Sequence, residues 1–321
     1  MKWRFLVTAL VVCCALARIS LAQKEPEREF QLQADSPKFW TLFERETKLE
    51  TSASGFGFTE GPVWDPAGFV YVSDEKTNRI FRVYLDGRRE ELISLGDPDG
   101  NTFDRQKGLI DCASVLRAII RIDRGGKYEV LAERFEGKRF NSPNDVVTGP
   151  DGAIYFTDPT LDLPKGEKQE IPFQGVYRLD ASRKVSLLTK ELTQPNGLAF
   201  SPDGKRLYVD DSEARNIWVF DFTSEHKLAN GRIFGEEPGD KSAGVPDGIK
   251  VDQTGNLYVT GPKGIWVWDP EGHHLGTIVL PEQPANLTWG DADYRTLYIT
   301  ATTSVYRLRT KAHGFVPYLA N

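Results

Sequence analysis

Four short signatures along the chain carry side chains that could bind a cation. Each stands just ahead of a strand-like run and a turn: Glu60-Gly61-Pro62, Pro143-Asn144-Asp145, Pro195-Asn196-Gly197 and Pro246-Asp247-Gly248. The side chains of Glu60, Asn144, Asn196 and Asp247 offer only oxygen as a ligand atom. Hard oxygen ligands favour Ca²⁺, Mg²⁺ or Mn²⁺ over a structural zinc, and the flexible coordination of Ca²⁺ suits a mixture of amides and carboxylates best.

Turn formation is the competing explanation for each signature taken alone. Asn, Asp and Gly ahead of a strand often build turns and caps without binding anything. Glu60 is not a turn former, however, so turn chemistry does not explain its presence. The four signatures together therefore predict a metal site.

The elements that must position these side chains form a repeat. Fourteen residues beyond the four positions stand Asp74, Asp158, Asp210 and Gly261, each at the end of a short aromatic or β-branched run. Two weaker copies of the unit begin at Asp99 and Ala285. Units of roughly 40 to 50 residues, with about four strands each, are typical of a propeller.

The sequence therefore predicts an all-β fold, a six-bladed β-propeller with four-stranded antiparallel blades. One residue of each blade, here called the slot residue, is expected to face the central axis. The six slot residues are Glu60, Asp99, Asn144, Asn196, Asp247 and Ala285. The later acidic layer, Asp74, Asp158 and Asp210, is interpreted as structural support at strand ends, and the long loop Thr160 to Phe173 as a possible lid.

The N-terminus has the pattern of a secretory signal peptide. Lys2 and Arg4 precede the apolar stretch Phe5 to Ala17, and small residues before Gln23 resemble a cleavage site. We therefore expect residues 1–22 to be a signal peptide, 23–49 a linker or closing segment, and 50–321 the propeller. The protein would be secreted or periplasmic, without membrane contact after cleavage, although an uncleaved anchor is the alternative.

The net charge and the cysteine content bear on two properties, nucleic-acid binding and disulfide formation. The chain of 321 residues has a formal net charge of −6, which argues against a nucleic-acid partner. Cys13 and Cys14 would leave with the signal peptide, so only Cys112 would remain and no intramolecular disulfide could form. Cys112 falls in a predicted strand, which indicates a buried thiol and not a nucleophile.

The same signatures carry a family resemblance. From about Phe56 to Arg309 the chain resembles the gluconolactonase and senescence-marker-protein (regucalcin) family, on motifs that follow one another in order. They are Glu60 to Trp64, Arg139 to Asp145, Tyr155 to Pro159, Pro195 to Phe200, and Pro246 to Gly248. The resemblance implies six-bladed propellers with one divalent metal at the axis, many of which hydrolyse sugar lactones.

Carried over to this chain, the resemblance implies roles for five of the slot residues. It makes Glu60, Asn196 and Asp247 the metal ligands, with Ca²⁺ first and Mg²⁺, Mn²⁺ or Zn²⁺ as alternatives. Asn144 and Asp99 would contact a small lactone substrate. The catalytic base would be Asp247, a role that the family leaves open between this residue and metal-bound hydroxide.

The second blade departs from the family pattern. Asp99-Gly100 stands where related gluconolactonases often have Asn-Gly, and Cys112 is followed by Ala113-Ser114-Val115-Leu116 where they often have Glu-His-Gly. The departure leaves the identity of the lactone open, and the sequence leaves the oligomeric state open as well. A metal-dependent esterase or phosphotriesterase and a non-catalytic Ca²⁺-binding propeller are the alternatives.

A serine hydrolase is disfavoured. The chain has no Gly-x-Ser-x-Gly elbow. Its four histidines stand outside the slots, at His226, His273, His274 and His313. The reaction that fits the resemblance is instead metal-assisted opening of a lactone ring by water.

Overall fold

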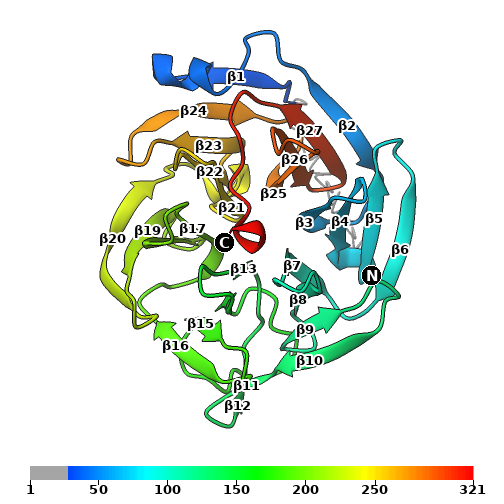
Figure 1. Ribbon diagram of the computed structural model, residues 1–321, viewed down its shortest axis with the longest axis vertical. Helices are drawn as coiled ribbons and strands as arrows, with labels where there is room; N and C mark the ends of the chain where they lie inside the picture. The colour runs from blue at the N-terminus through cyan, green and yellow to red at the C-terminus, as the bar shows by residue number, and fades with distance from the viewer. Residues whose placement is uncertain (1–27, 321) are drawn as a thin grey trace, which may run out of the picture.

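Six antiparallel sheets surround a central axis in the computed structural model, which describes residues 28–320 (Figure 1). Within this part of the chain the only helical elements are four short 3-10 helices. The prediction of a six-bladed β-propeller is confirmed. Successive blades follow one another in sequence, so each contacts its sequence neighbours around the ring.

The first three blades each contain four strands in chain order from the axis outward. Blade 1 comprises β3 (Thr59–Asp65), β4 (Phe69–Asp74), β5 (Arg79–Tyr84) and β6 (Arg89–Ser94). Blade 2 comprises β7 (Pro98–Phe103), β8 (Leu109–Ala113), β9 (Ala118–Ile122) and β10 (Tyr128–Ala132). Blade 3 comprises β13 (Val146–Thr148), β14 (Ile154–Asp158), β15 (Gly175–Leu179) and β16 (Val185–Thr189). A small hairpin precedes blade 3, formed by β11 (Arg134–Phe135) and β12 (Lys138–Arg139).

The other three blades follow the same order, and two of them recruit a strand from the N-terminal segment. Blade 4 comprises β17 (Pro195–Phe200), β18 (Arg206–Asp211), β19 (Asn216–Phe222) and β20 (Leu228–Glu236). Blade 5 comprises β21 (Ile249–Val251), β22 (Leu257–Gly261), β23 (Gly264–Trp268) and β24 (His274–Val279), with β1 (Gln31–Ala34) added at its edge. Blade 6 comprises β25 (Pro284–Gly290), β26 (Thr296–Ala301), β27 (Ser304–Arg309) and β2 (Leu49–Ser54).

The N-terminal segment closes the ring. β2 pairs with β27, so residues that precede blade 1 in sequence complete blade 6. β1 covers the outer edge of β24. The 3-10 helix η1 (Pro37–Thr41) buries Phe39, which packs with Phe43 against Tyr258 of blade 5. Aromatic burial of this kind is a large apolar contribution to stability.

The inner strands are buried on both faces because blades pack on one another. Every residue of β3, β7, β17 and β25 is buried. Trp64 stacks on Tyr298 between blades 1 and 6, with ring centroids 5.3 Å apart. Cys112 lies fully buried in β8, as expected, and burial raises the pKa of its thiol. The inner strands therefore form a rigid wall around the axis.

The C-terminal segment closes one end of that axis. Phe315 N donates to Val251 O, and the chain then forms the 3-10 helix η4 (Pro317–Leu319) at the centre of the ring (Figure 1). The Tyr318 hydroxyl donates to Trp64 O at 3.2 Å, and its ring packs edge-on against Phe103. Only about 40 Å³ of cavity remains between this segment and the inner strands. We call residues 315–319 the C-terminal plug.

The predicted signal peptide, residues 1–22, lies outside the described residues, as do Cys13 and Cys14. Among residues 28–320, no helix has the length and apolarity needed to cross a membrane.

Candidate metal and substrate site

The six slot residues meet at the end of the axis remote from the C-terminal plug. Glu60, Asp99, Asn196 and Ala285 are each the second residue of the inner strand of their blade. Asn144 stands two residues ahead of β13 and Asp247 two residues ahead of β21. The plug contacts residues three or four positions further along the same strands, such as Val63 and Val251. The slots thus lie at the opposite mouth.

A bulge re-aims the slot side chain in four blades. The register of the inner pair shifts immediately after Glu60, Pro98, Pro195 and Pro284. An extra residue in one strand of an antiparallel pair bends that strand and changes the direction of its side chain. The repeated bulge explains why polar side chains at these positions face the axis although the rest of each strand packs between blades.

Steric crowding explains why glycine follows the slot residue in blades 1 and 4. A Cβ on Gly61 would lie 2.0 Å from Asp99 O, and one on Gly197 would lie 2.0 Å from Asp247 O. The backbone of the slot residue in one blade therefore lies against the glycine that follows the slot residue in the preceding blade. This contact keeps the slots close together.

Asn144 and Asp99 are joined directly. Asn144 Nδ2 donates to Asp99 Oδ2 at 2.7 Å and reaches Asp162 Oδ2 at 3.5 Å. Ser114 Oγ also reaches Asp99 Oδ2, at 3.4 Å, and donates to Pro143 O at 2.7 Å. The second blade thus supplies Ser114 to this network, although its sequence departs from the family pattern.

Asn196 and Asp247 form the next pair around the axis. Asn196 Nδ2 donates to Ser212 Oγ at 3.1 Å, and Ser212 Oγ donates to Pro246 O at 2.7 Å. A hydrogen bond from Asn196 also counteracts the raised pKa of Asp247. With its nitrogen engaged, the Asn196 amide has its oxygen left as a ligand atom.

Glu60 is held from two sides. Its Oε2 accepts hydrogen bonds from Gly61 N at 2.5 Å and from Asn286 Nδ2 at 2.9 Å. Glu60 is 3% exposed, so these contacts replace water that the carboxylate would otherwise bind.

Carboxyls are crowded at this mouth of the axis. Burial, reinforced by the charge of Asp145, raises the pKa of Glu60 to about 8. Burial and the charges of Glu60 and Asp145 hold the pKa of Asp247 well above its usual range. Burial also raises the pKa of Asp99, with further contributions from Glu75 and Glu60.

Three more carboxyls stand around the same mouth, and burial raises the pKa of each. They are Glu75 (to about 10), Asp97 (to about 6) and Asp162. So many acids in a poorly hydrated place repel one another when they are ionised. A divalent cation would relieve that repulsion, and the oxygen-only donor set of Glu60, Asn196 and Asp247 suits a hard cation. The residues present therefore fit a metal site.

The later acidic layer, formed by Asp74, Asp158 and Asp210, supports the backbone on either side of the slots. Asp74 accepts from the backbone of Gly57 and Phe58 at 3.0 to 3.1 Å. Asp158 Oδ2 accepts from Asn141 N at 2.9 Å, and Asp210 Oδ1 from Gly197 N at 3.2 Å. These contacts agree with the structural interpretation of this layer.

The loop from Thr160 to Phe173 borders the site and is anchored. At its start, Asp162 N donates to Ser142 Oγ at 3.2 Å. Further along, the buried guanidinium of Arg117 binds Glu167 at 3.2 Å and Lys168 O at 3.4 Å, and its Nε donates to Phe140 O at 2.6 Å. The part of the loop that faces the slots is thus tied to blades 2 and 3.

An acidic group elsewhere in the described part of the chain is less suited to a metal. Asp269, Glu271 and His273 bring ligand atoms within 4.8 Å of one another at the turn between β23 and β24. Lys38 Nζ already lies 3.0 Å from Asp269 Oδ2, and Asp269 Oδ1 accepts from the His273 backbone at 2.9 Å. His273 itself is exposed at this hairpin turn.

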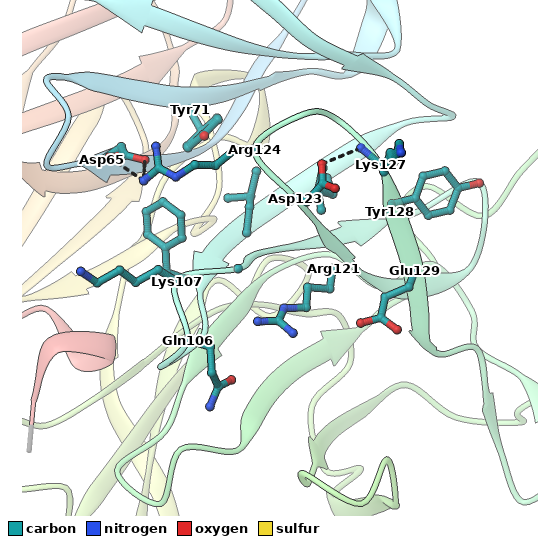
Figure 2. A pocket seen from close by; sticks show the side chains of 14 residues that line it. Asp65, Tyr71, Gln106, Lys107, Arg121, Asp123, Arg124, Lys127, Tyr128 and Glu129 are labelled. Carbon is teal, nitrogen blue, oxygen red and sulfur yellow. Dashed lines mark hydrogen bonds and ion pairs between the residues drawn. The ribbon is translucent and has the colours of Figure 1, made fainter.

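A groove of about 630 Å³ opens between blades 1 and 2, away from the slots (Figure 2). Its arginines are already paired, Arg124 with Asp65 at 3.1 Å and Arg121 with Asp104 at 2.9 Å. Since the groove contains none of the slot residues, it is separate from the candidate site.

The residues of the layer directly below the slots are not among those that the sequence predicted for the site. Lys250 Nζ lies 3.0 Å from Asn286 Oδ1, and Asn286 in turn binds Glu60. Asp145 lies in the same layer, where burial raises its pKa and Lys250 lowers it. A signal was present, because Asp145 and Asn286 are the two residues after a slot that are not glycine.

Comparisons with known proteins agree with this architecture. A family model described as the SMP-30/Gluconolactonase/LRE-like region matches residues 58–303. A gluconolactonase of Zymomonas mobilis is 34% identical over 313 residues, covering 87% of this chain and 86% of the relative.

Solved structures match over most of their length. A gluconolactonase from Xanthomonas campestris has a TM-score of 0.81 at 31% identity, covering 89% of this chain and 98% of its own. The calcium-binding protein regucalcin from Agrobacterium tumefaciens has a TM-score of 0.69 at 19% identity, covering 84% and 98%, a likeness that shows the fold alone.

Proposed function

This chain belongs to the SMP-30/gluconolactonase/LRE-like family, and from that premise we propose that it is a metal-dependent lactone hydrolase of the gluconolactonase type. The observation that carries the proposal is the meeting of Glu60, Asp99, Asn144, Asn196 and Asp247 at one mouth of the axis. In this proposal Glu60, Asn196 and Asp247 hold one divalent cation, with Ca²⁺ favoured by the oxygen donors. Asn144 and Asp99 hold the lactone.

The cation, when bound, would polarise the lactone carbonyl and make a nearby water more acidic. Asp247 takes the proton of the attacking water as general base. The water oxygen joins the carbonyl carbon, the ring C–O bond breaks, and the ring oxygen leaves as a hydroxyl after receiving the proton that Asp247 took from the water. The product is the open-chain hydroxy acid.

Asn144 and Asp99 would orient the ring through its hydroxyl groups. A carboxylate accepts hydrogen bonds from sugar hydroxyls, and an amide can both donate and accept. In this proposal the loop that begins at Thr160 limits the access of solvent to the bound lactone, because its Asp162 stands beside Asn144. Positioning of this kind supplies a large share of the rate gain of many enzymes.

The test is hydrolysis of a lactone panel in a pH-stat. Metal-stripped protein is re-supplied with Ca²⁺, Mg²⁺, Mn²⁺ or Zn²⁺, and the panel includes glucono-1,5-lactone, a simple ester and a phosphotriester. Asp247→Asn is the test variant, and Asp86→Asn, at an exposed turn, is the matched control. We expect lactone turnover that requires metal, vanishes in Asp247→Asn and persists in the control. Turnover of only the ester or phosphotriester would replace the lactone assignment, and cation binding without any turnover would favour a binding propeller.

We also propose that the protein is secreted or periplasmic. The support is the pattern of residues 1–22, which the structure does not describe. Mass spectrometry of the protein from its native host should find a mature N-terminus near Gln23. An intact N-terminal segment attached to the membrane would favour the anchor instead.

A further inference from the structure

The residue after each slot lines the axis one layer below the candidate cation site. In four blades it is glycine: Gly61, Gly100, Gly197 and Gly248. An added Cβ at these positions would lie 2.0 to 2.7 Å from backbone atoms of the next blade. Only blades 3 and 6 place a side chain there, Asp145 and Asn286, and their inner strands β13 and β25 lie across the axis from each other (Figure 1).

Asn286 can adopt only one amide orientation. Its Oδ1 accepts from Lys250 Nζ at 3.0 Å and from Leu287 N at 2.9 Å. An ammonium and a backbone N–H can donate but not accept, so both demand the oxygen end of the amide. Nδ2 is therefore turned to the opposite side, where it donates to Glu60 Oε2 at 2.9 Å.

This orientation decides which oxygen of Glu60 is left for a cation. Oε2 takes the hydrogen bond from Asn286 and a second one from Gly61 N. Two donors fill the lone pairs of one carboxylate oxygen. Oε1 remains, so Glu60 can offer a single, fixed oxygen.

We propose that Lys250 is a positioning residue that acts through Asn286 to present Glu60 Oε1 to the axial cation. The proposal rests on the proposed function, because it requires that a cation binds at Glu60. Contacts behind the ligands of a metal commonly change affinity or activity by about 10–100-fold when they are removed. Lys250 approaches the site from the plug side, where it also lines the small axial cavity.

An alternative role for Lys250, charge balance alone, predicts the opposite change in Ca²⁺ affinity when the ammonium is removed. If the ammonium only balanced the negative charge of Asp145 and Glu60, removing it would make the axis more negative. Ca²⁺ would then bind more tightly, since a nearby positive charge repels a cation. A positioning role predicts weaker binding, since Glu60 loses its fixed orientation.

The experiment is calorimetric titration of Ca²⁺ into metal-stripped full chain, which measures affinity without any substrate. The variants are Lys250→Met, Asn286→Leu and the double variant, with Lys205→Met at an exposed turn as the matched loss of one charge. We expect Kd to rise about 10–100-fold in each single variant. The double variant should bind Ca²⁺ no more weakly than the single variant with the higher Kd, because Lys250 acts through Asn286. Lys205→Met should bind as the unaltered protein does.

Unchanged or tighter binding in Lys250→Met would overturn the proposal. Additive losses in the double variant would also overturn it, since they would show independent actions. Asn286→Leu tests the contact to Glu60 if Lys250→Met does not fold. Absence of Ca²⁺, Mg²⁺ and Mn²⁺ binding in the unaltered protein would refute both this inference and the metal part of the proposed function. The expected pattern without lactone turnover would uphold the inference and refute only the lactonase.

Discussion

Asn144 Nδ2 lies 2.7 Å from Asp99 Oδ2, so the slots of blades 2 and 3 are joined by a hydrogen bond to a buried carboxyl. The bond fixes which end of the Asn144 amide is engaged and which is available to a ligand. It also gives Asp99 a role that a plain turn residue would not have.

Replacing Asp99 by alanine should free the Asn144 amide. We expect KM for a lactone to rise about tenfold, because leaving a buried polar group without its hydrogen-bond partner costs roughly 1–3 kcal/mol. The turnover number should fall less, since the proposed base is on another blade. Steady-state kinetics checks the split. A loss confined to the turnover number, with KM unchanged, would contradict a substrate-positioning role for Asp99.

Adding Ca²⁺ should raise the melting temperature of the metal-stripped protein. A ligand that binds only the folded state at 100 times its Kd stabilises that state by about 2.7 kcal/mol. The crowded carboxyls of Glu60, Asp99 and Asp247 make the metal-free state the less stable one. Differential scanning calorimetry measures the shift, and a chelator should reverse it. Identical melting curves with and without every candidate cation would be inconsistent with the site.

The stability of the protein should depend on pH through Asp158. Burial raises the pKa of this carboxyl to about 8 in the folded protein, whereas an unfolded chain would ionise it near its ordinary value of 3.8. The folded state therefore keeps a proton that the unfolded state loses between these values. The stability contributed by this group is complete below pH 3.8 and is lost as pH rises towards about 8.

The variant that tests this is Asp158→Asn, which cannot ionise and can still accept from Asn141 N. We expect its melting temperature, relative to the unaltered protein, to increase steadily from pH 5 to pH 8. Melting curves in metal-free buffer check the trend. A difference that is constant with pH, or that shrinks, would show that Asp158 is ionised in the folded state.

Removing the guanidinium of Arg117 should loosen the loop from Thr160 to Phe173. Arg117→Met keeps the apolar stem but loses the contacts to Phe140 O, Glu167 and Lys168 O. We expect faster proteolysis within the loop and a KM several-fold higher. Arg183→Met, which removes a surface pair with Glu129, is the matched control. Equal cleavage in the two variants would mean that Arg117 does not hold the loop.

The C-terminal plug should contribute to global stability. Tyr318→Ala removes a ring packed against Phe103 and a hydroxyl bound to Trp64 O. Loss of a large buried aromatic typically costs about 3–5 kcal/mol, and this half-buried one should cost somewhat less. Tyr318→Phe keeps the ring and should cost only about 1 kcal/mol. Urea unfolding gives both values, and equal losses in the two variants would assign the effect to the hydroxyl alone.

The repeat made the fold predictable from the sequence. Glu60 and Asp247 occupy equivalent positions of the repeat because every blade packs against its neighbours in the same way. The strands lie where aromatic and β-branched runs predict them. The slots converge because the ring is closed, which follows from the number of units. Local patterns therefore carried both the architecture and the candidate ligands.

What the sequence did not reveal depends on contacts across the ring. Asn286 and Glu60 are separated by 226 residues, and their hydrogen bond exists only once blade 6 lies beside blade 1. Lys250 resembles any strand lysine until its ammonium is found beside Asn286. Nor does the segment that contains Tyr318 belong to the repeat, so no periodic signal places it at the centre of the molecule.

The C-terminal plug leaves the central axis open to solvent at one end only. Tyr318 and η4 fill the opposite end, so in the proposed reaction a sugar acid formed beside Asp247 would leave along the route by which its lactone arrived. Product and substrate would then compete for the same passage, so the acid should act as a competitive inhibitor. The same geometry makes the mature N-terminus, near Gln23, the better place for a purification tag, because a tag at the C-terminus would be joined to the C-terminal plug.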